Sequence, residues 1–223
     1  MSSQMTDYAE ARNMMVDSQV RPNKVTDPRI IAAMRALPRE RFVPTEKAPL
    51  AYADEDVSLG GGRVLMEPML IARLLQTAGI QAGDRVLMVA AGCGYAACVA
   101  ASCGAVVVAL ESEDDLAAQA HVLLAEFAPD VKLVVGPLVE GCAAHAPYDL
   151  VVIDGAYDEL PPALVAQLRN PGGRLVGVRT GPGRIGQAVL GEVVGTGGLR
   201  TQAVFDAATP VLPELRRAAA FVF

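Results

Sequence analysis

The stretch Asp84-Arg-Val-Leu-Met-Val-Ala-Ala-Gly-Cys-Gly-Tyr95 decides the fold of this 223-residue chain. Its first half is a short apolar run that predicts a buried strand over about 85–90, and the alanine-rich residues from 94 to 103 predict a helix. The next apolar run ends in an acid, Glu111. A strand that turns through glycines into a helix, followed by a strand ending in an acid, is typical of a nucleotide-binding βαβ unit.

The glycine turn indicates which kind of nucleotide is bound. It reads Ala90-Ala-Gly-Cys-Gly94 and lacks the G-x-G-x-x-G pattern that surrounds a pyrophosphate. Its glycines still let the backbone approach a ligand closely, and Glu111 lies where an acid can accept hydrogen bonds from ribose hydroxyls. This combination suits a nucleoside such as S-adenosylmethionine better than NAD. The predicted cofactor-binding residues are Ala90, Ala91, Gly92, Cys93, Gly94, Tyr95, Glu111 and Ser112.

Two alternatives stay open for this motif. A glycine-rich βα turn can occur without any ligand, and Glu111 can be a solvated acid at the end of a strand. The rest of the chain has to decide between these interpretations.

Composition and charge argue against several classes of function. The net charge of −6 and the pI near 5.0 are unfavourable for bulk binding to nucleic acid or to anionic membranes. No apolar run reaches the roughly 18 residues of a membrane span, and the polar start lacks the apolar core of a signal peptide. We therefore expect a cytoplasmic protein with neither a membrane nor a nucleic-acid partner.

The cysteines do not indicate a metal site. They are Cys93, Cys98, Cys103 and Cys142, and none belongs to a C-x-x-C pair. Zinc sites need paired cysteines or clusters with histidine, so we expect no metal. Small packing residues in a reducing compartment are the favoured interpretation.

Ahead of the glycine turn, the chain predicts an N-terminal helical extension over residues 1–80. Helices are expected at 8–20, 29–37 and 67–78, and the chain between the end of the second helix and about Arg63 is expected to be irregular. Three consecutive glycines, Gly60 to Gly62, indicate either a mobile loop on the substrate side of a site or a linker.

From residue 81 to 223 the pattern predicts a Rossmann-like domain that forms one compact unit with the extension. Continuous apolar runs predict strands buried on both faces, and hence a parallel sheet with helices on both sides. After Gly183 strands follow one another without long helices, which predicts an antiparallel edge. The expected fold is a class I methyltransferase fold with a mostly parallel seven-stranded sheet. The segments with a strand pattern are 85–90, 105–111, 131–136, 148–154, 173–178, 186–194, 201–205 and 218–223, and helices are expected at 114–127, 138–144 and 162–169.

Several stretches outside the glycine turn are distinctive. They are Met15-Val-Asp-Ser-Gln-Val-Arg21, Thr26-Asp-Pro-Arg29, Leu37-Pro-Arg-Glu-Arg-Phe-Val-Pro44, Leu160-Pro-Pro-Ala-Leu164 and Asn170-Pro-Gly-Gly-Arg-Leu-Val176. With them, the chain resembles the protein-L-isoaspartate (D-aspartate) O-methyltransferase family over almost its whole length. The resemblance implies an enzyme that binds S-adenosylmethionine and methylates abnormal aspartyl carboxylates in damaged proteins, a step in protein repair. Its partner would be a protein or peptide with isoaspartyl residues, in an oligomeric state that the sequence leaves open.

The chain departs from this family's usual motifs in three places. Met66 holds the position of a serine linked to catalysis, and Glu67 holds that of a glutamine. The first motif has Met88 for its acid and Ala90 for its first glycine, and the Gly-Asp-Gly after the third strand reads 136-Gly-Pro-Leu-138. A thioether donates no hydrogen bond, and Glu67 would repel an anionic isoaspartyl carboxylate. The changes predict a preserved scaffold with an altered site and weaker cofactor binding.

No catalytic residue can be assigned, and Met66, Glu67 and Asp154 are the candidates on the substrate side. Asp154 ends the fourth strand, where ligands bind in open α/β sheets, and it either marks a changed substrate or caps the following helix. Arg63 could serve an anionic substrate or merely solvate its loop.

Two functions are compatible with these residues. The first is an isoaspartyl-type methyltransferase, with its usual or a shifted substrate, which intact Gly92, Gly94 and Glu111 favour. The alternative is a catalytically silent relative that keeps the fold as a ligand-binding or regulatory module.

Overall fold

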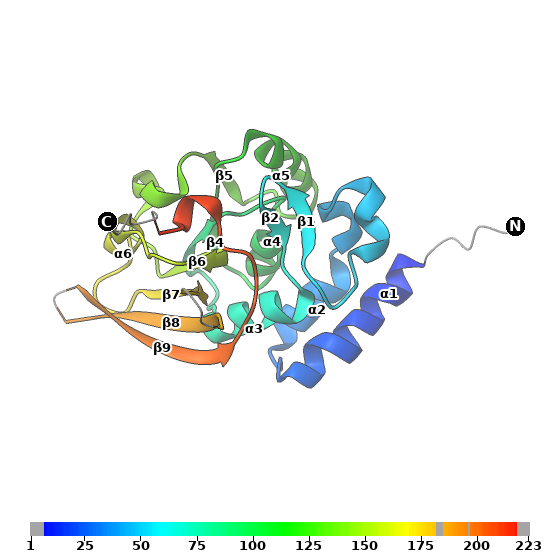
Figure 1. Ribbon diagram of the computed structural model, residues 1–223, viewed down its shortest axis with the longest axis horizontal. Helices are drawn as coiled ribbons and strands as arrows, with labels where there is room; N and C mark the ends of the chain where they lie inside the picture. Colours follow the sequence, from blue (N-terminus) through cyan, green and yellow to red (C-terminus); the bar gives the residue numbers. More distant parts are fainter. Residues whose placement is uncertain (1–6, 182–184, 196, 218–223) are drawn as a thin grey trace, which may run out of the picture.

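A computed structural model describes residues 7–181, 185–195 and 197–217. Its main feature is a seven-stranded sheet with the strand order β5-β4-β3-β6-β7-β8-β9 (Figure 1). The first five strands in this order run parallel, and β8 and β9 are antiparallel. The predicted class I methyltransferase fold with its antiparallel edge is confirmed. The strands are β3 (Arg85–Val89), β4 (Val106–Glu111), β5 (Lys132–Val135), β6 (Leu150–Tyr157), β7 (Arg174–Arg179), β8 (Gln187–Val194) and β9 (Gly198–Asp206).

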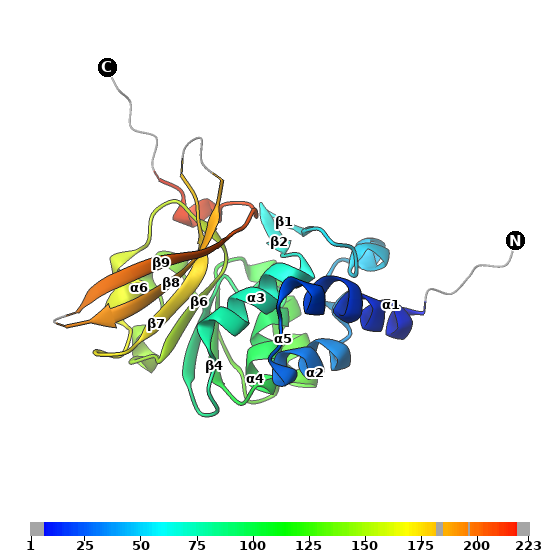
Figure 2. The ribbon, with the colours of Figure 1, turned by 90° about the horizontal axis from the view of Figure 1, so that it is seen from below.

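Helices cover the two faces of the sheet unequally, as Figure 2 shows from below. One face carries α3 (Pro68–Ala78), α4 (Tyr95–Ser102) and α5 (Asp114–Phe127), whose buried residues share a large core with the sheet. The other face carries the short α6 (Pro162–Ala166) and the 3-10 segments η5 (Leu138–Glu140), η6 (Ala143–His145) and η7 (Pro213–Leu215). A second, smaller core lies on that face.

The N-terminal extension packs on the helix-rich face. Helix α1 (Tyr8–Met15) continues through a π-helical turn, η1 (Val16–Val20), and a 3-10 turn, η2 (Arg21–Asn23), so the predicted helix over 8–20 is present. Asp27 caps α2 (Pro28–Ala36), which has proline in its first turn and corresponds to the helix expected at 29–37. The extension contributes Met15, Ile30 and Phe42 to the same core as the sheet, so the two regions share one interior. Two more 3-10 segments, η3 (Arg39–Phe42) and η4 (Thr45–Leu50), lead toward the sheet.

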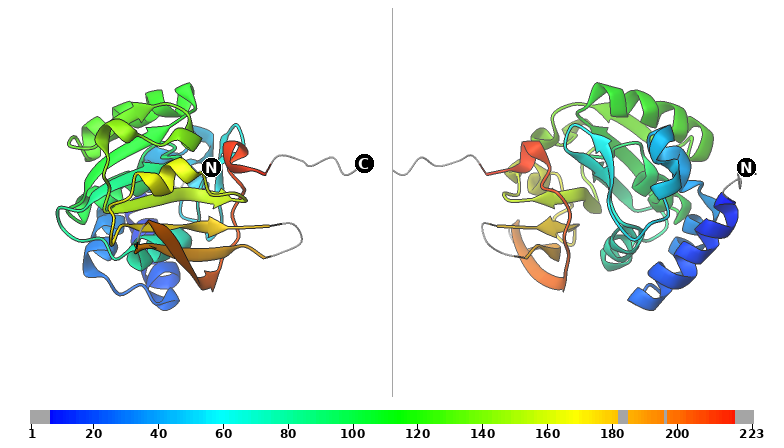
Figure 3. Two further views of the ribbon diagram at one scale, coloured as in Figure 1. Left: turned by 90° about the vertical axis from the view of Figure 1, so that its left-hand side faces the viewer. Right: turned by 45° about the vertical axis from the view of Figure 1, so that its right-hand side comes forward.

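The stretch expected to be irregular contains a β-hairpin, so that prediction is wrong. Strand β1 (Val57–Gly60) pairs antiparallel with β2 (Arg63–Leu65), and the glycines 60–62 form the turn with φ of 98°, 57° and 78°. Positive φ explains why three glycines stand together. The strands were missed because runs of three and four residues, one ending in glycine, are too short to show alternation. We call β1, its turn and β2 the hairpin; Figure 3 shows it at the front of the right-hand view.

Other boundaries differ in detail. Strand β6 extends to Tyr157 because its register with β7 shifts between Val152 and Ala156 and pairing then resumes. The helix predicted over 138–144 is two separate 3-10 turns, and α6 ends at Ala166 rather than 169. The strand predicted over 218–223 lies outside the described residues.

Ala90 is the backbone outlier of the fold. It adopts φ = 65° directly after β3, a left-handed conformation that this structure shows for only one other described non-glycine residue, Lys24. The side chain of Ala90 is buried in the smaller core. The left-handed conformation costs a residue with a Cβ atom about 1–2 kcal/mol, whereas glycine adopts it freely.

We predict that Ala90→Gly leaves the free energy of unfolding equal to that of the wild type, or raises it by up to about 1 kcal/mol, because relief of strain exceeds the roughly 0.8 kcal/mol lost with the buried methyl group. Ala97→Gly is the matched control, since Ala97 is equally buried but lies inside α4. The control should lose about 2 kcal/mol, from helix propensity and the methyl group together. Urea unfolding measures both, and an equal loss in the two variants would contradict strain at Ala90.

Candidate functional site

The candidate site lies at the carboxyl ends of the parallel strands. The chain leaves β3 for β4 on one side and later returns to β6 on the other, so the strand order reverses between β3 and β6. In open α/β sheets ligands bind at the carboxyl edge beside such a point. The glycine turn after β3, Glu111 at the end of β4 and Asp154 in β6 all belong to this edge.

The glycine turn has the backbone shape that the motif predicts. Gly92 has φ = 55°, and Gly94 has φ = 91° and forms the N-cap of α4. The Cys93 thiol lies 3.5 Å from Gln119, and burial raises its pKa to about 11, so it stays protonated at neutral pH. Tyr95 is buried and packs edge-on against Phe42, which makes its side chain part of the core. The turn therefore offers backbone groups rather than side chains.

Glu111 is the centre of the hydrogen-bond network at this edge. Its side chain is fully buried, and its Oε2 accepts a hydrogen bond of 2.7 Å from the Gly92 amide. Its Oε1 accepts from the amides of Ser112 and Glu113, at 2.8 and 3.0 Å. The alternative of a solvated acid is therefore wrong. The carboxylate fixes the glycine turn and the start of α5 relative to each other.

Arg63 pairs with this carboxylate. Its Nη1 and Nη2 donate to Oε1 and Oε2 of Glu111 at 2.9 and 2.6 Å, and only 3% of the Arg63 side chain is exposed. Arg63 therefore does not solvate its loop, and that interpretation is wrong. No local pattern signals the pair, because the two residues are 48 positions apart.

Two segments cover the edge from outside. The hairpin places Leu59 so close to the turn that a Cβ atom on Gly92 would lie 3.3 Å from its Cδ1. Residues 207–215, which we call the strap, return from β9 and place Leu212 against Gly155. Thr209 of the strap donates to Asp56 at 2.7 Å, just ahead of the hairpin. In Figures 1 and 2 the strap passes beside β1 and β2.

The substrate-side candidates lie between the hairpin and α3. Met66 is buried, and its carbonyl accepts a hydrogen bond of 2.5 Å from the fully buried Arg39, whose Nε donates to the carbonyl of Ala51. Glu67 is the N-cap residue of α3, and burial raises its pKa, with Asp56 and Asp54 adding to the effect. This side of the site is acidic and has no hydroxyl at position 66.

Arg39 is a buried residue that no sequence motif singles out. Its guanidinium lies 5.0 Å from the centre of the Tyr95 ring, and among the described residues its Nη1 has no hydrogen-bond partner. The only signal for it was its place inside the stretch 37–44 that carries the family resemblance.

Asp154 lies near both guanidinium groups. Removal from solvent raises its pKa to about 7, although the positive charges of Arg63 and Arg39 act in the opposite direction. Helix α6 begins after Pro161 and has no side-chain cap, so the helix-cap interpretation of Asp154 is wrong. Asp154 is thus a partly buried carboxyl group at the same edge as Glu111, able to hold a proton at neutral pH.

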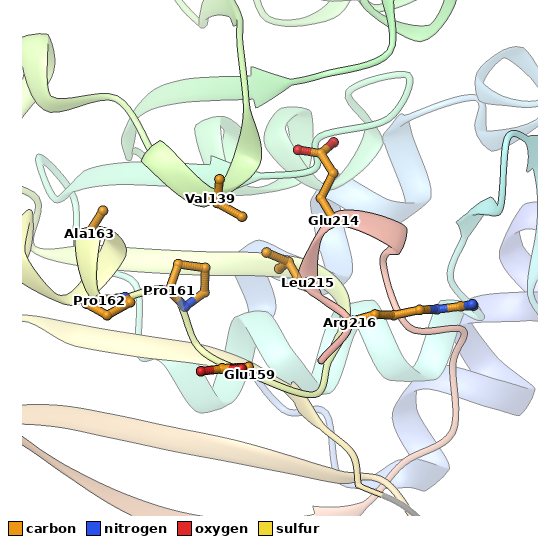
Figure 4. Close-up of a pocket in the computed structure, with 8 residues that line it drawn as sticks. All are labelled: Val139, Glu159, Pro161, Pro162, Ala163, Glu214, Leu215 and Arg216. Atoms are coloured by element: carbon orange, nitrogen blue, oxygen red, sulfur yellow. The ribbon is translucent and has the colours of Figure 1, made fainter. Parts of the chain in front are cut away.

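A separate pocket of about 290 Å³ lies beside the strap, between η5, α6 and η7. Val139, Pro161 and Leu215 give it an apolar floor, while Glu214 and Arg216 extend from the η7 segment in different directions (Figure 4). Glu214 accepts a hydrogen bond of 3.0 Å from the Leu138 amide, which joins η7 to η5. None of the predicted site residues lines this pocket.

The described residues contain no cluster of three or more metal-ligating side chains. In the same part of the chain no helix is long and apolar enough to cross a membrane. The four cysteines are all buried and free.

Comparison with known proteins agrees with the fold and identifies a family. Residues 10–189 match the family model described as protein-L-isoaspartate(D-aspartate) O-methyltransferase. The chain is 40% identical over 181 residues to a protein-L-isoaspartate O-methyltransferase of Methylorubrum extorquens, covering 81% of this chain and 78% of the relative. It is 39% identical over 178 residues to the protein of that name from Methylorubrum populi, covering 80% and 82%.

Two solved structures share the whole fold. A protein-L-isoaspartate O-methyltransferase matches with a TM-score of 0.78 at 23% identity, covering 92% of this chain and 67% of the other. A Plasmodium falciparum protein described as a putative protein-L-isoaspartate O-methyltransferase, in complex with S-adenosyl-L-homocysteine, matches with a TM-score of 0.72 at 19% identity. The match covers 91% of this chain and 98% of that one.

The raised pKa of Asp154 has a consequence for stability. An unfolded aspartate titrates near 3.8, so between about pH 4 and pH 7 the folded protein holds a proton that the unfolded chain has lost. Stability contributed by this group therefore falls as the pH rises through that window. We predict that Asp154→Asn removes this decline and raises the free energy of unfolding at pH 8 by up to about 4 kcal/mol.

Urea unfolding at pH 5 and pH 8 measures the change in Asp154→Asn. Asp158→Asn is the control, because Asp158 directly follows the same strand and accepts a hydrogen bond from the Thr180 hydroxyl. A pH dependence in Asp154→Asn that equals that of the wild type would show that Asp154 titrates normally.

Proposed function

Because the chain belongs to the protein-L-isoaspartate(D-aspartate) O-methyltransferase family, we propose that it transfers a methyl group from S-adenosylmethionine to the abnormal carboxylate of isoaspartyl or D-aspartyl residues in proteins. The proposed role is the repair of damaged proteins in the cytoplasm. The alternative of a silent binding module finds no support in the relatives, which are named as methyltransferases.

The observation that carries the proposal is Glu111 beside the glycine turn. A buried carboxylate at the end of the second parallel strand is the group that accepts hydrogen bonds from the two ribose hydroxyls of a nucleoside. The Oε2 atom of Glu111 lies 2.7 Å from the amide nitrogen of Gly92. Gly92 has no side chain, so a ligand can approach the backbone closely at this position. The donor and acceptor types at this edge therefore fit the nucleoside part of S-adenosylmethionine.

The remaining cofactor contacts would be fewer than usual in this family. The acid of the first motif is replaced by the fully buried Met88, and the acid after β5 is replaced by Pro137. Neither replacement accepts a hydrogen bond through its side chain as a carboxylate does. The affinity for the cofactor would then depend mainly on Glu111, the glycine-turn backbone and apolar contacts.

Methyl transfer makes modest demands on the protein. The bound cofactor supplies an activated methyl group, and the chain has to align the acceptor oxygen with it and exclude water. A carboxylate is already deprotonated, so no general base is needed. We infer that the extension and the hairpin form the substrate side, with Glu67 facing the acceptor, whereas the side chain of Met66 is buried in the core. The acidic charge of Asp54, Asp56 and Glu67 opposes an anionic acceptor, which predicts slow turnover on isoaspartyl peptides.

We predict that S-adenosylhomocysteine binds the purified protein in isothermal titration calorimetry and that Glu111→Gln weakens binding by at least about tenfold, because an amide accepts ribose hydrogen bonds less strongly than a carboxylate. Labelled S-adenosylmethionine should methylate a peptide with an isoaspartyl residue and spare the matched aspartyl peptide.

Circular dichroism shows whether Glu111→Gln folds. If the wild-type protein does not bind S-adenosylhomocysteine at millimolar concentration, the proposal is overturned. Binding with no transfer to the isoaspartyl peptide would retain the cofactor but reject the substrate.

A further inference from the structure

The oxygen atoms of Glu111 are already fully used in this structure. Five donors point at its carboxylate: two from the Arg63 guanidinium and one each from the amides of Gly92, Ser112 and Glu113. A carboxylate offers about four lone-pair positions. A ribose diol, which would bring two more donors, has no free position on this carboxylate while Arg63 is bound.

The three amides cannot leave without moving the turn after β3 or the start of α5. They belong to the backbone that Glu111 holds in place, at distances of 2.7 to 3.0 Å. Arg63 differs, because it comes from β2 of the hairpin and reaches Glu111 only with its side chain. Its guanidinium is the one donor group that a rotamer change or a small movement of the hairpin can remove.

Resting on the proposed function, we propose that the Arg63–Glu111 pair is a latch: it closes the nucleoside end of the cofactor site, and S-adenosylmethionine binds only when Arg63 leaves Glu111. The ribose hydroxyls then replace the two guanidinium hydrogen bonds on the same oxygen atoms. The latch makes Arg63 a determinant of cofactor affinity that acts against binding.

The hairpin is built to hold the latch closed. Leu59 packs against the glycine turn from the strand opposite β2, and Gly61 lies so near Glu113 that a Cβ atom on this glycine would be 3.8 Å from Oε2 of Glu113. Closing the latch therefore also covers the turn along which the nucleoside would lie. The glycines 60–62 leave the hairpin's own turn exposed and without side chains, although a Cβ atom on Gly62 would lie 3.3 Å from Pro213 of the strap.

A displaced guanidinium has acidic groups to receive it. The positive charge of Arg63 acts on Asp154 and opposes the rise that burial causes in the pKa of this carboxyl group, and Glu113 is exposed beside the hairpin turn. Arg63 can therefore leave Glu111 without becoming an isolated buried charge, which would be strongly unfavourable.

The energetic consequence follows from the populations of the two states. If the open state is a small fraction of the empty protein, the apparent dissociation constant is the intrinsic one divided by that fraction. An open fraction of about one in ten weakens binding about tenfold. A variant without the guanidinium should therefore bind the cofactor more tightly than the wild type.

The test compares Arg63→Gln with the wild type by titration calorimetry with two probes, S-adenosylhomocysteine and adenosine. We expect a dissociation constant for S-adenosylhomocysteine at least about tenfold lower in the variant. Adenosine should gain by the same factor, since the latch acts at the ribose that both probes carry. Arg41→Gln is the matched control: it removes the bidentate arginine partner of a glutamate, Glu126, on the exposed surface. It should leave both affinities unchanged.

A second variant keeps the test informative if Arg63→Gln does not fold. Arg63→Lys keeps a positive charge beside Glu111 but cannot make two parallel hydrogen bonds, so it should bind both probes with affinities between the other two proteins. A hydrogen-exchange measurement on the wild type needs no substitution, and saturating S-adenosylhomocysteine should change the protection of the amides of residues 57–65.

The outcomes separate the latch from the proposed function. Binding of S-adenosylhomocysteine by the wild type with equal or weaker binding by Arg63→Gln would overturn the latch and leave the cofactor site in place. The absence of binding by both proteins at millimolar ligand would overturn the proposed function, and the latch with it.

Discussion

The structure of the site depends on one buried carboxylate. Glu111 joins three parts of the chain that are distant in sequence: the glycine turn after β3, the start of α5 and the hairpin. Buried ion pairs gain little net stability, but removing one partner leaves an uncompensated charge that costs several kcal/mol. The same group therefore holds the edge of the sheet together and is the natural acceptor for a ribose. These two roles compete for the same oxygen atoms.

The sheet could be predicted from the sequence because parallel strands have a clear signature. Runs such as 106–110 and 150–153 are apolar throughout, since both faces of such a strand are covered, and their order with the intervening helices fixes the topology. The hairpin escaped prediction for the opposite reason. Its strands have only four and three residues and one of them ends in glycine, so they are too short to establish a periodic pattern. Their pairing is stabilised by contacts with distant segments, which local sequence does not reveal.

The candidate site was predicted by position more than by chemistry. Glycines and an acid at the right spacing located the edge near Glu111, since that spacing follows from the βαβ unit itself. What each side chain does there depends on neighbours from far away in the chain. Arg63 reaches across 48 positions to Glu111, and Asp154 obtains its raised pKa from burial among groups of other strands. Neither the Arg63–Glu111 pair nor the environment of Asp154 can be recognised from the local sequence pattern.

The antiparallel end of the sheet has a consequence for the behaviour of the protein at high concentration. Among the described residues, strand β9 is the last in the sheet, runs over nine residues and is exposed along most of its length. An open strand of this length offers unpaired amides and carbonyls to any other chain, which is how edge-to-edge aggregation begins. Two features of β9 oppose it: a bulge opposite Ala188 and Val189, and charged side chains at Arg200 and Asp206. The edge thus combines irregular pairing with charge, the devices by which natural sheets remain separate in crowded solution.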